Sequence, residues 1–255
     1  MTQPVSSGNS ELTLSLPSEQ SAFVTTQWSV VVRAAGPADS AAQAALESLS
    51  RRYWFPLYAF TRRRVSTIHE AQDLTQEFFL RLLEKNVLAA ASPERGRFRS
   101  FLLGSLKHFL ANEWDRTKAQ KRGGTCERLS LDWENGESRL SLEPTHANTP
   151  EREFERQWAL TLLDVVIRRL QDEFVRAGKF QQFELLKETL TGNRAGIDYS
   201  MISAELQISE EVARQTAHRL RKRYRELLRE EVAQTVESPA DVEDEIGRLF
   251  GALGA

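Results

Sequence analysis

The side chains with the clearest chemical purpose lie between residues 199 and 224. Six of them are long donors or amides that one helix would place on a single face: Arg214, Gln215, His218, Arg219, Arg221 and Lys222. Such groups reach phosphate oxygens and base edges, so the pattern predicts contact with nucleic acid. A structural hairpin of two helices with solvated charges is the alternative interpretation.

The residues around this face predict a helix-turn-helix. A short helix carrying Ile202 and Leu206 is followed by a tight turn at Gln207 and Ile208. Ser209 is a good N-cap, and two glutamates follow it at the positive end of the second helix. The second helix is expected to bury Val212, Thr216, Leu220, Tyr224 and Leu227. A turn without glycine requires a residue at an unfavourable backbone angle or a slightly different turn.

A second set of basic and amide side chains borders another expected helix, whose apolar stripe runs from Phe98 to Trp114. These flanking residues are Arg97, Arg99, Lys107, His108, Asn112, Arg116 and Lys118. Arginines and lysines there can meet the phosphates of a single strand, while amide and loop groups hold unstacked bases. Phe101, Phe109 and Trp114 are expected to pack in the core. His108 fits a surface histidine as well as a base contact.

Three polar residues form a different kind of surface. Asp73, Gln76 and Glu77 are three and four residues apart, so a helix places them on one face, opposite Leu74 and Phe78. The face predicts docking of a basic or amide-rich partner helix. Solvated carboxylates without a partner are the alternative.

No constellation of residues indicates catalysis. The four histidines are scattered, and the single cysteine, Cys126, lies in a segment without periodicity. No hydrolase or zinc-protease motif is present, and Gly123-Gly124 is not a phosphate-binding loop. We therefore expect no catalytic residues, no metal site and no cofactor, and a protein that is not an enzyme.

The charge distribution supports a polyanionic partner. The chain of 255 residues has 34 basic and 36 acidic side chains, yet five arginines and no acid fall between residues 51 and 64. Residues 95–122 hold eight basic against two acidic side chains, and residues 214–229 hold seven against one. No apolar run is long enough to span a membrane, and the N-terminus does not resemble a secretory signal. A cytoplasmic protein that makes no membrane contact is expected.

The elements that position these groups are all expected to be helical. Apolar residues spaced three and four apart begin at Ser40, with a bend expected at Pro56, and recur over His69–Glu84. Thr149-Pro150-Glu151 predicts the start of a further helix, which buries Phe154, Trp158, Leu162, Val165 and Val166. Another helix is expected from Phe180 to Leu190, and no strand pattern is found. The fold class is therefore all-α.

The composition suggests two helical domains joined by a flexible linker, with the helix-turn-helix in the C-terminal one. Residues 1–22 are polar and expected to be disordered, and residues 23–122 form the first domain. Residues 123–148 lose periodicity and form the linker. The second domain covers 149–236, and an acidic tail follows at 237–255.

Together these features resemble a known family. The run D-L-T-Q-E-F-F begins at Asp73, and P-E-R-G-R-F-R-S-F-L-L begins at Pro93. A basic helix, a linker and a C-terminal helix-turn-helix follow, as in extracytoplasmic-function (ECF) sigma factors, the two-domain specificity subunits of bacterial RNA polymerase. The resemblance covers roughly residues 25–236. The departures are Gln207 in place of a usual glycine, His108 in place of a common asparagine, and the tail.

The resemblance implies roles for individual residues. Binding of core RNA polymerase is implied for Asp73, Gln76 and Glu77. The loop at 92–98 would accept a flipped base. Contact with the minus-ten element of promoter DNA is implied for Arg97, Arg99, His108, Asn112 and Arg116. Contact with the minus-thirty-five element is implied for Arg214, Gln215, His218, Arg219 and Lys222.

The partners expected from this resemblance are core RNA polymerase and promoter DNA. An anti-sigma factor or a regulatory kinase would be a further partner, and the tail could itself mask the basic helix that precedes it. A stand-alone helix-turn-helix regulator is the alternative function. It would bind a symmetric site as a dimer, without the polymerase.

Overall fold

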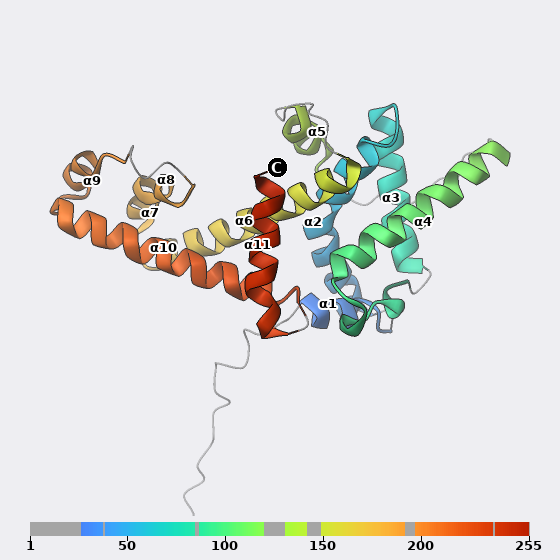
Figure 1. Ribbon diagram of the computed structural model, residues 1–255, viewed down its shortest axis with the longest axis horizontal. Coiled ribbons are helices and arrows are strands. Elements are labelled where there is room, and N and C mark those ends of the chain that lie inside the picture. The colour runs from blue at the N-terminus through green and yellow to red at the C-terminus, as the bar shows by residue number, and fades with distance from the viewer. Residues whose placement is uncertain are drawn as a thin grey trace, which may run out of the picture.

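The computed structural model describes residues 27–37, 39–84, 87–119, 131–141, 149–191, 197–236 and 238–254. Over these ranges every regular element is a helix, which confirms the all-α fold class (Figure 1). The α-helices are α1 (Gln27–Ala34), α2 (Ser40–Arg62), α3 (Ile68–Glu84), α4 (Phe98–Ala119), α5 (Trp133–Ser141), α6 (Pro150–Arg176), α7 (Phe180–Leu186), α8 (Glu188–Thr191), α9 (Tyr199–Leu206), α10 (Glu210–Ala233) and α11 (Val242–Leu253). Short 3₁₀ turns cover Val87–Ala90, Pro93–Arg95 and Pro239–Asp241. The expected disordered segment, 1–22, lies outside the described residues.

Helix α6 begins where its sequence predicts. The Thr149 hydroxyl accepts a hydrogen bond from the backbone N–H of Arg152 at 3.3 Å, and Pro150 takes the first helical position. Two glutamates follow in the first turn, where the helix dipole favours negative charge. Phe154, Trp158, Leu162 and Val166 are buried as expected, whereas Val165 is partly exposed.

Helix α2 continues through Pro56, so the expected bend does not divide it. Pro56 has no N–H to donate to the carbonyl of Arg52, which removes one bond from the helix. The surrounding turns are almost wholly buried, from Phe55 to Thr61. We infer that packing on both sides stabilises the helix at this position.

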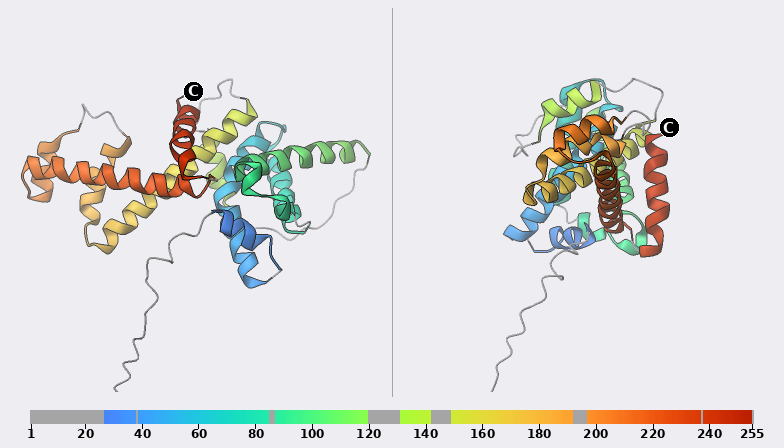
Figure 2. Two further views of the ribbon diagram at one scale, coloured as in Figure 1. Left: turned by 60° about the horizontal axis from the view of Figure 1, so that its bottom comes forward. Right: turned by 90° about the vertical axis from the view of Figure 1, so that its left-hand side faces the viewer.

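Helix α6 joins the two ends of the molecule. Its N-terminal part packs along α2, and α10 and α11 also pack on it. In two views α1–α4 lie to one side of α6 and α7–α10 to the other (Figures 1 and 2). One continuous apolar cluster reaches from Trp28 in α1 to Leu249 in α11. The domain boundaries at 122 and 149 stay predictions, but the core is shared across them.

Part of the expected linker is a packed helix. Trp133 of α5 meets Trp54 and Tyr58 edge to face, with ring centroids 5.6 and 5.3 Å apart. The Tyr58 hydroxyl donates a hydrogen bond to Glu137. A Cβ at Gly136 would lie 3.0 Å from the Trp54 ring, so this glycine permits close approach. The glycine that suggested a linker therefore has a packing role, and the prediction is wrong for 133–141. Residues 123–130 and 142–148 lie outside the described ranges.

Candidate nucleic-acid interface

A tight turn joins α9 to α10. Asp198 caps α9 by accepting hydrogen bonds from the N–H groups of Ser200 (2.9 Å) and Met201 (3.2 Å). Gln207 then adopts a left-handed conformation, with φ 53° and ψ 44°. Ser209 caps α10 by accepting from the N–H of Val212 at 3.3 Å. Of the two alternatives for a glycine-free turn, the structure thus has the first, a residue at an unfavourable backbone angle.

The buried stripe of α10 faces α9 and the core. Thr216, Leu220 and Leu227 are buried as predicted, and Tyr224 is half-buried. Val212 is 40% exposed, contrary to the prediction. At about 100° per residue, Val212 lies roughly 90° from the middle of the stripe, which explains its exposure.

The opposite face of α10 carries the five predicted DNA contacts. All are exposed: Arg214, Gln215, His218, Arg219 and Lys222. Helical geometry spreads them over an arc of roughly 140°, centred opposite the buried stripe. Arg214 forms an ion pair with Glu210 at 2.8 Å, but both side chains are about half exposed. Such a surface pair is weak and can give way to a phosphate.

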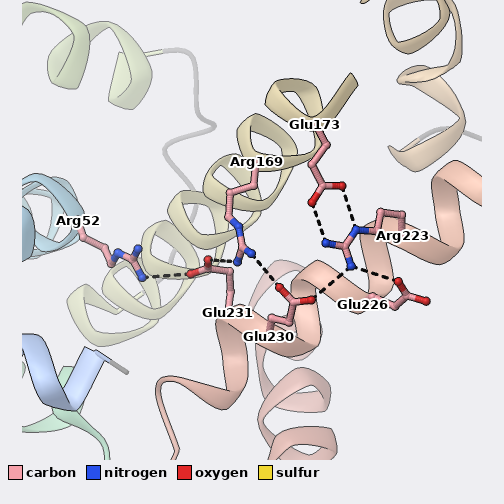
Figure 3. A network of polar contacts seen from close by, with 7 residues as sticks. All are labelled: Arg52, Arg169, Glu173, Arg223, Glu226, Glu230 and Glu231. Carbon is pink, nitrogen blue, oxygen red and sulfur yellow. Dashed lines mark hydrogen bonds and ion pairs between the residues drawn. The ribbon is translucent and has the colours of Figure 1, made fainter. Parts of the chain in front are cut away.

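Arg223, in the C-terminal half of the same basic block, is bonded to α6. Arg223 makes two parallel bonds to Glu173 of α6, at 2.9 and 2.7 Å (Figure 3). This contact raises the pKa of Arg223 and lowers that of Glu173. Arg229 pairs with Glu243 at 2.7 Å. Arg223 is therefore directed toward α6, whereas Arg225 and Arg229 are exposed.

The ion-pair network continues across three helices. Arg169 of α6 contacts Glu231 at 2.5 Å and Glu230 at 2.8 Å (Figure 3). Glu231 also meets Arg52 of α2 at 3.3 Å, and its side chain is only 5% exposed. The network holds the C-terminal part of α10 against α6 and α2. It thereby sets the direction of the N-terminal half, which carries the exposed basic side chains. Sequence reasoning missed it because Arg52 and Glu231 are 179 residues apart.

The arginines at residues 51–64 also pair with acidic side chains of this chain. Arg63 pairs with the buried Glu153 and Arg64 with Glu151, both at 3.1 Å. Hydrogen bonding to Lys107, aided by nearby Arg64, lowers the pKa of Glu151. These contacts join the end of α2 to the first turn of α6. This block is therefore largely neutralised within the chain.

The second candidate face lies on α4. His108, Asn112 and Arg116 are exposed and four residues apart, so they share one side of the helix. Arg116 contacts Glu113 at 2.9 Å, with the arginine side chain 68% exposed. These three of the five predicted minus-ten contacts are accessible together.

Of the other two, Arg99 is buried and Arg97 is partly exposed, with 27% of its side chain accessible. The Arg99 side chain is 5% exposed; it donates to Glu155 at 2.8 Å and to Glu245, and lies 4.1 Å over the Trp158 ring. Arg97 forms an ion pair with Glu245 at 2.7 Å, although its angles do not make a directed hydrogen bond. Burial lowers the pKa of Arg97. The prediction of solvent-facing flanks fails for Arg99 because α6 and α11 cover the start of α4.

The loop before α4 is also only partly available. Gly96 adopts φ +106°, with open space where a side chain would lie. Phe98, at the end of the predicted base-accepting loop, is 2% exposed and packs edge to face on Tyr53 and Trp28. Its ring belongs to the core and is not free to stack on a base.

The acidic face lies on α3. Asp73 is exposed, and Gln76 and Glu77 are partly buried. Glu77 pairs with Arg81 at 3.2 Å, and Arg81 also contacts Glu113 of α4. Asp73 therefore offers the most accessible carboxylate of this face.

Within the described ranges, no three histidine, cysteine, aspartate or glutamate side chains gather in a way that could hold a metal ion. None of the helices there has the length and apolar content needed to cross a membrane. Cys126 and His146 lie outside those ranges. No family model matches the chain, and no curated protein or solved structure matches it either.

Proposed function

We propose that the chain is an RNA polymerase sigma factor of the ECF type, which binds core polymerase and directs initiation at specific promoters. The observation that carries the proposal is the exposed face in the N-terminal half of α10. Five exposed donors and amides occupy one face of a capped helix that is entered by a tight turn. A recognition helix that lies in the major groove presents such side chains to base edges and phosphates.

A second accessible surface supports the two-site arrangement. On α4, His108, Asn112 and Arg116 are exposed together and suit contact with an unpaired strand. On α3, Asp73 offers a carboxylate to a basic partner. A chain with separate faces for duplex, single strand and protein fits initiation better than simple operator binding.

The free energy needed to open promoter DNA implies that the polymerase must contribute to strand separation. Opening a few base pairs costs about 1.4 kcal/mol for each base step, and these costs add up over the opened segment. Capture of an unstacked base returns about 1–3 kcal/mol. The chain alone is therefore expected to bind promoter DNA weakly and to leave it closed.

Stoichiometric binding to purified core RNA polymerase tests the proposal against the alternative of a stand-alone regulator. We expect the chain to elute with core polymerase at one copy per enzyme in gel filtration. Elution as a free monomer or dimer beside the enzyme, together with tight binding of a symmetric duplex, would favour the regulator.

A further inference from the structure

The C-terminal helix α11 inserts a carboxylate into the interior. Glu245 has no exposed side-chain surface, whereas its neighbours Glu243 and Asp244 are exposed. A buried carboxylate is costly unless charges and hydrogen bonds compensate it. Arg99 donates a hydrogen bond to one carboxylate oxygen, and Arg97 supplies a positive charge at the other. Glu245 thus specifies where α11 lies.

The position of α11 decides which surfaces are covered. Helix α11 packs on α6. It contacts α10 near the C-terminal end of α10, where Arg229 pairs with Glu243 (Figure 1). The five outward side chains at 214–222 stay exposed. The sequence suggested that the tail could mask the basic helix before it. In the structure it leaves the outward side chains of that helix exposed and covers the start of α4 instead.

We propose that α11 is an autoinhibitory latch that withholds Arg97 from single-stranded DNA and covers Arg99. This inference rests on the proposed function and concerns the regulation of its minus-ten surface. Release of α11 frees the Arg97 guanidinium beside the open loop at Gly96 and uncovers Arg99, while α10 stays available throughout. The latch gates strand capture and not duplex recognition.

The build of α11 suits reversible release. Its buried apolar anchors are Val242 and Leu249, whereas Phe250 is 50% exposed. Arg99 keeps Glu155 and the Trp158 ring when Glu245 leaves, so it does not become an isolated buried charge. The latch therefore opens without unfolding the start of α4.

The test compares Glu245→Gln with Glu243→Gln in the full chain. Both remove one negative charge from α11, but Glu243 is exposed and paired only on the surface. Hydrogen exchange of residues 242–253 should accelerate by about tenfold or more in E245Q, because a buried partner is lost. The E243Q protein should exchange like the parent protein.

Binding of a fluorescein-labelled single-stranded oligonucleotide then measures the consequence. E245Q should bind about tenfold more tightly, because apparent affinity follows the fraction of open molecules. The slope of log K against log salt concentration should steepen by about 0.7, for one more phosphate contact, by Arg97, on a single strand. Faster exchange without tighter binding would overturn the gating, and unchanged exchange would overturn the latch.

A second variant and a second probe keep the result unambiguous. Leu249→Ala removes an apolar anchor and leaves all the charges in place, so it should also release α11 and tighten single-strand binding, even if E245Q loses helicity. L249A that releases α11 without tightening binding would overturn the gating.

Binding of duplex DNA and core polymerase is measured on the same samples. Loss of those activities in every protein would refute the proposed function, and the comparison of E245Q with E243Q would still test the latch.

Discussion

Arg214 and Arg223 lie on one helix and have opposite roles. Arg214 is exposed beside a half-exposed glutamate, whereas Arg223 is held by Glu173, with further contacts to Glu226 and Glu230. A guanidinium that already has good partners gains little from a phosphate. The setting of each arginine, and not the number of charges in the block, therefore decides which of them is available to a phosphate.

Substitution of Arg214 or Lys222 by alanine should weaken binding to duplex DNA carrying the upstream promoter element. Each lost phosphate contact should flatten the salt dependence of log K by about 0.9. Arg51→Ala is the matched control, since Arg51 is exposed and pairs with Glu47 at 2.7 Å in the same i,i+4 manner. Fluorescence anisotropy over a salt series measures both quantities. An unchanged slope in R214A and K222A would exclude this face.

The strained turn makes a prediction about stability. Gln207→Gly should raise the free energy of unfolding by about 0.5–1 kcal/mol, because glycine adopts a positive φ without steric cost. Gln234→Gly is the control: Gln234 also caps a helix C-terminus, but at φ −74°. That change should be neutral or destabilising, since glycine only adds entropy to the unfolded chain. Urea denaturation distinguishes the two, and equal effects would contradict the strain.

At the scale of elements, α10 depends on the ion-pair network at its base. Glu231→Gln should lower the free energy of unfolding by about 3 kcal/mol, because Arg52 and Arg169 lose a buried partner. Glu226→Gln should cost less than about 1 kcal/mol, since that side chain is 44% exposed. Similar losses in both variants, measured by urea denaturation, would show that burial of Glu231 does not matter.

Helix α3 carries the expected polymerase contact. Asp73→Lys should reduce affinity for core polymerase by about tenfold or more, because it places a like charge against a basic partner. Asp172→Lys on α6 is the control, since Asp172 is also an exposed carboxylate but lies on a different helix. Both variants should keep parental helicity by circular dichroism. Full affinity in D73K would reject α3 as the docking element.

Local signals in the sequence account for much of the helical structure. Caps at Thr149 and Ser209 locate the starts of α6 and α10, and apolar spacing identifies most buried residues. The failures come from contacts between distant segments. Arg99 and Glu245 are 146 residues apart, and no periodicity links them. Helix α5 was missed because Gly136, needed for packing on Trp54, resembles a linker residue.

At the scale of the whole molecule, α6 connects the helices that carry the two candidate DNA surfaces. It carries Glu153 and Glu155 toward the α2–α4 side and Arg169 and Glu173 toward α10. The two candidate DNA surfaces are thereby held on one scaffold, with α11 against its middle (Figures 1 and 2). Such an arrangement can present duplex and single strand to the polymerase in a fixed relation.

Transcription in vitro tests the central claim most directly. Core RNA polymerase lacking any specificity subunit, supplied with this chain and a library of genomic promoter fragments, should produce transcripts from defined start points. The E245Q protein should produce more of them, and D73K and R214A fewer. Absence of defined transcripts from every template, with a folded protein and active core enzyme, would contradict the account.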